Sequence, residues 1–336
     1  MAGILSPKIR IDSVSPPAAI PGGQLTIRGS GLGSDKRRQP VVSFGGVPGR
    51  LVVSTPDRLV VTIPDSAETG SFNIRSARAD SGEVPFALGR LLGTELHPVA
   101  NPVVDGEGNV FTTQSGARGK KTPVSVYKIA HDGGSVSGFL SGIVNATGLV
   151  FQPDGTLLVS SRHEGTVYEV TPSGGVEIFA EGMGVATGLA IDRDENVYVG
   201  DRTGTVFKIS RDRKIYVFAT LEPSVAAYHM AVAPDGVLYV TAPTTSSSDA
   251  VHRIDPEGVV TVWFRGFGRP QGVAFDSADR LHVCASFRGQ RGIFRLTEEG
   301  VKQTVSGQGI VGLTFTPDNN LVVATGNSVY SIPDVS

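Results

Sequence analysis

Arginines in polar loops are the residues of this chain best suited to bind an anion. A guanidinium group can hold a carboxylate or a phosphate through two parallel hydrogen bonds. Several of them converging on one point would form a clamp for an anionic ligand. The competing interpretation is that each arginine is solvated or pairs with a local acid such as Glu164 or Asp201. The arginines in question are Arg118, Arg162, Arg202 and Arg288.

Histidine is the side chain best suited to proton transfer near neutral pH, and His229, His163 and His97 are the candidates. A neutral imidazole also binds transition metals. Its commoner role is a hydrogen bond to a neighbouring backbone group. The sequence holds no Gly-Lys-Thr/Ser phosphate loop, no Gly-x-Ser-x-Gly elbow and no His-Glu-x-x-His segment. The catalytic residues, if any exist, therefore stay unassigned.

One short sequence motif recurs six times, and the strands that it predicts must position these side chains. Each copy has a small or polar residue, a glycine, an apolar stretch, polar turn residues and a second apolar run; the clearest copies are 147–159 and 187–199. A period of about 40–45 residues with several strands per unit is typical of a β-propeller. Aligned on the glycine, the copies fall at Asn101, Gly148, Gly188, His229, Gly272 and Gly312.

The repeat resembles NHL repeats and the six-bladed propellers of the regucalcin/gluconolactonase superfamily. We therefore expect an all-β chain whose propeller spans 89–336. The last unit is short by one strand, so we expect a segment within 84–97 to close the ring, since an open ring would expose strand edges. The expected blades lie near 97–140, 145–180, 185–220, 226–265, 269–305 and 309–332.

The residues that precede the repeated glycines are expected to line the mouth of the central channel. The gluconolactonase resemblance implies a divalent metal there, held by carboxylate and amide oxygens. Where the resemblance implies a Glu, an Asn and an Asp, this chain has Ala100, Thr147 or Thr187, and Gln271, and hard cations prefer charged oxygen ligands. We therefore predict no cofactor and no metal site, with a rebuilt divalent-metal site as the alternative. The predicted ligand-binding residues are Asn101, Asn145, Thr147, Arg162, Thr187, Arg202, Tyr228, His229, Gln271 and Arg288.

The first part of the chain carries no copy of the repeat. Its sequence at 11–16 and 21–33, followed by Phe44-Gly45-Gly46, resembles the IPT/TIG family of immunoglobulin-like domains. We expect a β-sandwich over 1–88, and the resemblance implies a spacer or docking role. Some TIG domains contact DNA, but one basic triplet, Lys36-Arg37-Arg38, more simply forms a solvated loop. Nucleic acid is therefore an unexpected partner.

Composition excludes several function classes. A formal charge of −2 gives no reason to expect nucleic acid or an anionic membrane as a partner. The single cysteine, Cys284, lies in an apolar run and is predicted to be a buried, inert thiol. No signal-peptide core precedes Arg10, which favours the cytoplasm, with a periplasmic or secreted location as the alternative.

The sequence thus predicts a binding protein. Its propeller face with the variable loops would recognise a small polar or anionic ligand, a glycan or a protein. The alternative is a gluconolactonase-like hydrolase with an altered site in the channel. Superfamily resemblance alone supports that alternative, and propellers host many unrelated functions.

Overall fold

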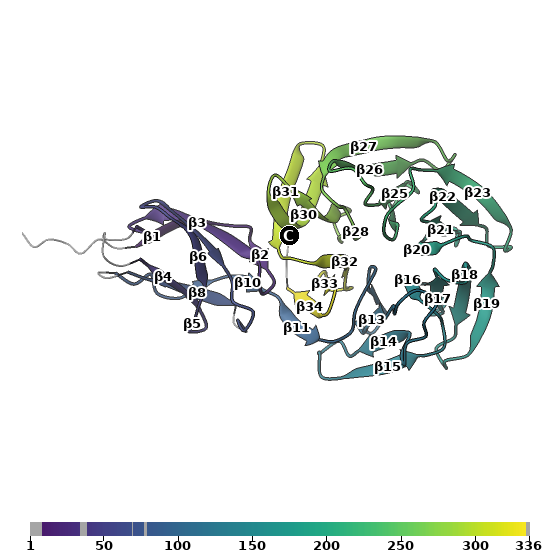
Figure 1. Cartoon of the computed structure of the whole chain (residues 1–336), viewed down its shortest axis with the longest axis horizontal. Coiled ribbons are helices and arrows are strands. Elements are labelled where there is room, and N and C mark those ends of the chain that lie inside the picture. Colours follow the sequence, from purple (N-terminus) through teal and green to yellow (C-terminus); the bar gives the residue numbers. More distant parts are fainter. Residues whose placement is uncertain (1–8, 34–38, 69, 77–78, 334–336) are drawn as a thin grey trace, which may run out of the picture.

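The computed structural model describes residues 9–33, 39–68, 70–76 and 79–333 of the chain. It is all β, with a small two-sheet domain beside a ring of sheets (Figure 1). The basic triplet at 36–38 lies outside the described residues. Among the described elements, none is a helix long and apolar enough to cross a membrane.

Alternating apolar residues build the N-terminal domain. In β3 (Gln24–Ser30), Leu25 and Ile27 are buried while Gln24 is exposed, as expected for a strand with one face on a core. Phe44 and Phe72 pack in that core with ring centroids 5.9 Å apart. One sheet has the order β1 (Arg10–Ser15), β3, β7 (Arg58–Thr62), β6 (Arg50–Ser54), and the other β5 (Val47–Pro48), β4 (Val41–Phe44), β8 (Ser71–Arg75), β9 (Val84–Pro85).

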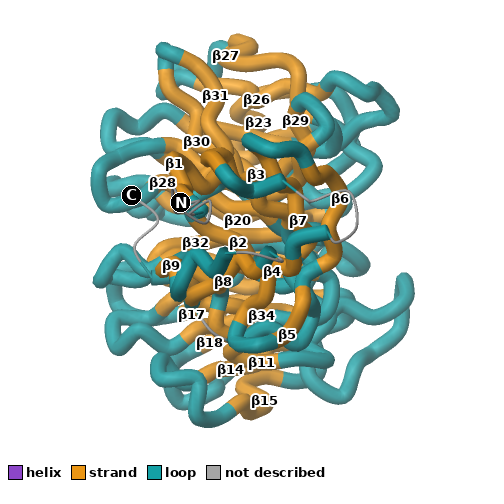
Figure 2. Tube along the Cα trace, turned by 90° about the vertical axis from the view of Figure 1, so that its left-hand side faces the viewer, coloured by secondary structure: helices purple, strands orange, loops and turns teal. Residues whose placement is uncertain are grey.

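The ring consists of six blades, each with four antiparallel strands, arranged around a central axis (Figure 1). Seen from its edge, the ring has its strands in the middle and its loops gathered at two faces (Figure 2). The first blade has β12 (Val103–Val104), β13 (Val110–Thr113), β14 (Val126–Ile129) and β15 (Val136–Leu140), and the second has β16 (Ala146–Phe151), β17 (Leu157–Ser161), β18 (Thr166–Val170) and β19 (Val176–Ala180). The third has β20 (Ala186–Ile191), β21 (Val197–Asp201), β22 (Thr205–Ile209) and β23 (Ile215–Thr220), and the fourth has β24 (His229–Val232), β25 (Leu238–Thr241), β26 (Asp249–Ile254) and β27 (Val260–Phe267). The fifth has β28 (Val273–Phe275), β29 (Leu281–Phe287), β30 (Gln290–Thr297) and β31 (Gly300–Ser306), and the sixth has β32 (Ile310–Phe315), β33 (Leu321–Thr325), β34 (Val329–Ile332) and β11 (Arg90–Gly93).

The sixth blade combines the two ends of the ring. β11 pairs antiparallel with β34, with Arg90 opposite Ser331 and Leu91 opposite Tyr330. β11 is therefore the fourth strand of a blade whose other three strands come last in the chain. It lies within the segment 84–97 from which the sequence analysis expects the closing strand.

The repeated glycines lie where neighbouring blades approach most closely. A Cβ on Gly148 would overlap with the carbonyl oxygen of Thr187 in the next blade, and one on Gly188 would overlap with that of Tyr228. Gly312 is in the same position against the carbonyl of Ala100. The repeat therefore has glycine because the next backbone occupies the space that a side chain would need.

Hydroxyl groups of the second strands join adjacent blades across these contacts. Thr113 Oγ1 donates to the carbonyl of Thr147 at 3.2 Å, and Ser160 Oγ donates to that of Thr187 at 2.6 Å. Thr241 Oγ1 donates in the same way to the carbonyl of Gln271. The corresponding position in the fifth blade is Cys284, which is buried and whose pKa burial raises, as expected for an inert thiol.

The N-terminal domain shares a sheet with the fifth blade. β2 (Ala18–Ala19) runs parallel to β31, and β10 (Ala87–Leu88) runs parallel to β2, so the sheet has the order β10-β2-β31-β30-β29-β28. Ile20 N–H donates to the carbonyl of Ser306 at 3.0 Å, and Gln24 N–H donates to Ser306 Oγ at 2.8 Å. The Ile20 side chain is buried with Leu313 and Ile332 of the sixth blade. The two parts of the chain therefore form one continuous structure.

Replacing Ile20 by alanine should destabilise this junction. Ile20 is 1% exposed, and truncation of such a side chain leaves a cavity between the domain and two blades. We expect the free energy of unfolding to fall by about 2–5 kcal/mol, measured by urea denaturation. The control is Val52→Ala, at a valine of the same domain that is 48% exposed, with an expected effect within about 0.5 kcal/mol. Equal effects of the two changes would contradict the packing role of Ile20.

Asn101 replaces the repeated glycine in the first blade and bonds to two other blades. Its Nδ2 donates to the carbonyl of Val273 at 3.0 Å, and its Oδ1 accepts from Leu313 N–H at 3.2 Å. Asn101→Leu removes both bonds and should lower the free energy of unfolding by about 1–3 kcal/mol in a thermal or urea melt. Asn327→Leu, at an exposed loop asparagine, is the control; it removes one exposed hydrogen bond, from Nδ2 to Thr94 Oγ1 at 3.1 Å, and should cost less. A melt of Asn101→Leu that matches the wild type would refute this role.

Candidate ligand-binding site at the channel mouth

Loops between the second and third strands present three arginines at one face of the ring. Asn145 holds the loop that carries Arg118: its Oδ1 accepts from Gly119 N–H at 2.8 Å, and its Nδ2 donates to the carbonyl of Gly116 at 2.8 Å. The turn that carries Arg202 begins at Asp201. The Asp201 carboxylate accepts from Val185 N–H at 3.0 Å and from Thr203 N–H at 2.9 Å. The arginines are therefore mounted on loops that buried polar side chains fix in place.

These arginines converge on one cavity. Arg118, Arg162 and Arg202 line it together with His163, and its volume is about 390 Å³. Arg162 Nη2 donates to the carbonyl of Gly116 at 3.2 Å, so one of its donors is used within the protein. The convergence of Arg162 and Arg202 is the arrangement that an anion clamp requires.

No carboxylate of the described part of the chain pairs with any of the three arginines. Glu164 accepts instead from the hydroxyl of Tyr168 at 2.9 Å, and Asp201 is occupied by loop amides. Burial lowers the pKa of Arg162, and the charges of Arg202 and Arg118 lower it further. The cavity thus gathers positive charge, and no acid among the described residues pairs with it.

A second cavity of about 250 Å³ lies at the channel mouth and shares Arg162 and Arg202 with the first. His229 and Gln271 also line it. His229 is 3% exposed, and its ring makes no hydrogen bond to any described residue. Burial lowers its pKa to about 4, so the imidazole is neutral at pH 7. An unpartnered imidazole facing a cavity is available to hydrogen-bond a ligand. The other lining residues are Pro98, Val99, Thr147, Thr187, Val225, Ala226, Ala227 and Val311.

The hydroxyl groups of Thr147, Thr187 and Tyr228 donate hydrogen bonds to backbone carbonyls of the protein. Thr147 Oγ1 donates to the carbonyl of Asn145 at 2.9 Å, and Thr187 Oγ1 donates to that of Gly200 at 2.8 Å. Tyr228 is fully buried in the wall, and its hydroxyl donates to the carbonyl of Glu222 at 2.6 Å. Tyr228 therefore lines a small cavity next to His229 but not the mouth cavity. Its side chain has turned into the space left by the absent side chain of Gly200.

Two other predicted residues lie apart from the site. Arg288 is exposed at the tip of the β29–β30 hairpin, with its guanidinium 5.0 Å from the ring centroid of Phe287, and it lines neither cavity. Three of the four candidate arginines therefore line one cavity, and Arg288 does not, because its hairpin is longer than its counterparts. His97 is exposed, has a φ of 50° and also lines neither cavity. Asn101 and Asn145, as described above, bond to backbone groups.

The metal-binding pattern of gluconolactonases has no counterpart in the described residues. Across them, no group of three or more His, Cys, Asp and Glu side chains lies close enough together to hold a metal ion. His163 and His229 line different cavities. The donor set at the mouth, with arginine, threonine, glutamine and one neutral imidazole, suits an anion better than a hard cation.

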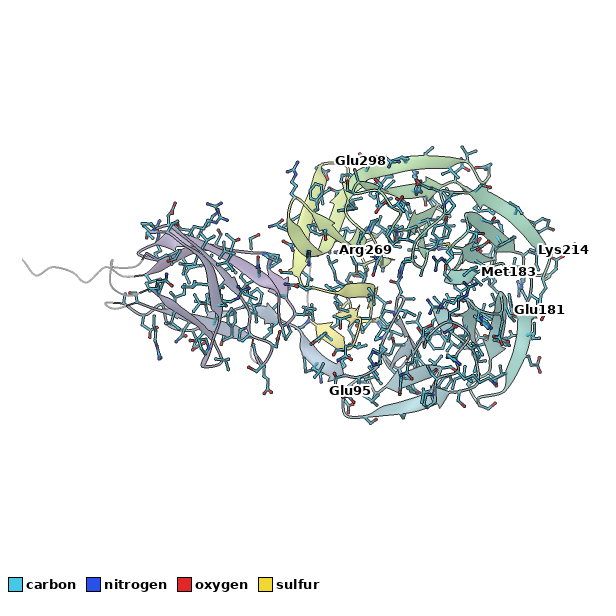
Figure 3. The ribbon with its side chains drawn as sticks, in the orientation of Figure 1. Glu95, Glu181, Met183, Lys214, Arg269 and Glu298 are labelled. Atoms are coloured by element: carbon cyan, nitrogen blue, oxygen red, sulfur yellow. The ribbon has the colours of Figure 1, made fainter. Side chains whose placement is uncertain are left out.

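Sequence reasoning missed two arginines farther along the same face. Arg269 and Arg291 line a cavity that also contains Gln271. Arg269 lies on the inner part of the ring, on the side nearer the N-terminal domain (Figure 3). Its position just before Pro270-Gln271-Gly272 could have indicated this, since residues before the repeated glycine approach the mouth.

Comparison with known proteins identifies the N-terminal domain. Residues 10–86 match the family model described as the IPT/TIG domain. A comparison with curated protein sequences gives no significant match.

Solved structures with the same fold share little sequence with this chain. An auxiliary nutrient binding protein from Bacteroides thetaiotaomicron is 13% identical, with a TM-score of 0.55 over 96% of this chain and 97% of that one. A candidate gluconolactonase is 19% identical, with a TM-score of 0.58 over 73% and 91% of the two chains. Virginiamycin B lyase from Staphylococcus aureus is 14% identical, with a TM-score of 0.52 over 84% and 93%. The chain therefore consists of an IPT/TIG domain followed by a six-bladed β-propeller with the fold of the gluconolactonase and virginiamycin B lyase structures.

Proposed function

We propose that this protein binds a small anionic ligand at the mouth of the propeller channel. The observation that carries the proposal is the convergence of Arg118, Arg162 and Arg202 without a balancing acid among the described residues. An anion would remove their mutual repulsion and gain charge-assisted hydrogen bonds. The cavity of about 390 Å³ is within the size range of small-molecule sites.

A binding role accounts for the site better than hydrolysis does. A general base works best when its pKa is near the working pH, and the pKa of His229, lowered to about 4, makes it a poor proton acceptor at pH 7. The neutral ring of His229 suits a hydrogen-bonding role beneath the arginines. Among the structures with this fold, the name of the auxiliary nutrient binding protein also agrees with a binding role.

Substitution of the central arginine should weaken anion binding. Arg162 lines both cavities, and a lost hydrogen bond to a charged group costs about 1.5–3 kcal/mol, so Arg162→Ala should weaken affinity about tenfold or more. Isothermal titration with galacturonate, citrate, lactate and glycerol phosphate measures this, with galactose as the neutral counterpart of galacturonate. Arg253→Ala is the matched control, because Arg253 is an exposed arginine of β26 that lines neither cavity. Equal affinities for Arg162→Ala and wild type would refute the clamp, as would a wild-type protein that binds none of these anions.

Anion binding should strengthen as the pH falls from 7 to 5. A bound anion beside His229 would raise the pKa of the ring above its free value of about 4. The complex then takes up a proton more readily than the free protein, so protons favour binding. His229→Gln should flatten this dependence in titrations at pH 5, 6 and 7. His163→Gln, measured in parallel, shows how much of the pH dependence comes from the second histidine, which lines the arginine cavity. An unchanged pH slope in His229→Gln would show that His229 does not sense the ligand.

A further inference from the structure

A continuous series of cavities leads from the channel mouth to the N-terminal domain. The mouth cavity shares Gln271 and Val311 with a cavity of about 310 Å³ between the fifth and sixth blades. That cavity shares Arg291 and Gly307 with a further one of about 380 Å³ between the ring and the N-terminal domain. Each of the four cavities is thus linked to the next by residues that line both. The arginine cavity, the mouth cavity and these two cavities are together called the groove below.

The far end of the groove is formed by the outer face of a sheet of the N-terminal domain. Gln24 and Thr26 of β3 and Arg58 of β7 line it there. Opposite them lie residues of the fifth blade, including Gln290 and Arg291 of β30. Because β2 belongs to the sheet of that blade, the two walls are held in fixed register and the far end is preformed.

Positive charge recurs along the whole groove. Among the residues that line its four cavities there is no aspartate and no glutamate. None of the arginines among them pairs with a carboxylate of the described residues. A ligand that carries one negative charge could use only part of this surface, whereas a ligand with repeated charges could use all of it. The arginines are Arg58, Arg118, Arg162, Arg202, Arg269 and Arg291.

Amide side chains line the groove beside the arginines, most of them in the cavity at the N-terminal domain. An amide both donates and accepts hydrogen bonds, as does a sugar hydroxyl. Gln303 shows how such a side chain is held: its Nε2 donates to the carbonyl of Arg291 at 2.9 Å, which leaves its Oε1 for a ligand. A surface that offers both amides and guanidinium groups fits a chain that carries both hydroxyls and carboxylates. The glutamines that line the groove are Gln24, Gln271, Gln290, Gln303 and Gln308.

Other anionic polymers fit the groove less well. Single-stranded nucleic acid is usually bound by aromatic side chains on which its bases stack, and no Phe, Tyr or Trp lines these four cavities. An extended peptide commonly adds as a strand to an open sheet edge. The edge of the fifth blade beside the groove, β31, is already covered by β2.

We propose that the groove binds an acidic oligosaccharide, a chain of sugars with repeated carboxylates, whose one end occupies the channel mouth and whose other end reaches the IPT/TIG domain. The inference rests on the proposed anion site, which is the first subsite of the groove. It gives the N-terminal domain a role in ligand recognition through Arg58 and Gln24.

Chain length is the variable that tests the groove. Galacturonate and its dimer, tetramer and hexamer are titrated calorimetrically into the full-length protein. We expect the affinity to rise about tenfold or more from the monomer to the hexamer. Arg58→Glu, at an exposed residue of the far end, should abolish this gain and leave monomer affinity unchanged. Arg162→Ala should weaken binding at every length. Arg253→Glu, at an exposed arginine outside the groove, should change neither.

The outcomes separate the groove from the mouth site. Affinity that is independent of length, or a length gain that survives Arg58→Glu, would overturn the groove while the anion site stands. Equal affinity for neutral gluco-oligosaccharides of the same lengths would overturn the requirement for carboxylates. Tighter, length-dependent binding of oligoglutamate or single-stranded DNA would overturn the assignment to a glycan. A wild-type protein that binds neither the monomer nor the hexamer would overturn the mouth site itself.

Discussion

The close approach of neighbouring blades around the channel is the constraint on which the rest of the structure depends. At most repeats the backbone of the next blade fills the space above a glycine, as at Gly148 and Gly188. Hydroxyls such as that of Ser160 then bond across the contact. Interiors packed this tightly transmit small changes, so one bulky residue at such a position would displace a whole sheet. The loops that carry the arginines are held in common register because the inner strands below them cannot separate.

Two positions break this rule, and they do so in different ways. Asn101 uses its amide to replace the lost backbone contact by hydrogen bonds to two other blades. His229 forms no such bond, and its neutral ring faces the cavity at the mouth. Where sequence departs from a repeat without a structural substitute, function is the more economical explanation. The unpartnered ring of His229 and the unbalanced charge of Arg162 meet at the same cavity, which is why the mouth is the candidate site.

The architecture could be predicted from sequence because it depends on periodicity. The spacing of the glycines and the sequence of the first 88 residues were sufficient to predict the two-part all-β fold. Side-chain direction is a different matter. Tyr228 and Thr187 occupy equivalent places in the repeat, yet the tyrosine turned into the wall because Gly200 left room for it. Arg288 was misplaced because hairpin length, which decides how far a tip lies from the channel, is set by pairing that no single copy of the repeat reveals. Arg291 escaped notice because its neighbours in the cavity include Gln271 and Val311, which are distant in sequence.

The chain that leaves the N-terminal domain passes directly from one blade to the next. β10 ends at Leu88 in the sheet of the fifth blade, and β11 begins at Arg90 in that of the sixth, so only Gly89 separates them. Gly89 N–H donates to the carbonyl of Ala19 at 2.8 Å. A propeller without this domain would keep β11 but would lose the strand that covers β31. Its fifth blade would then offer unpaired backbone groups to other molecules, a common route to edge-to-edge aggregation. The immunoglobulin-like domain therefore also covers the outer strand of the fifth blade.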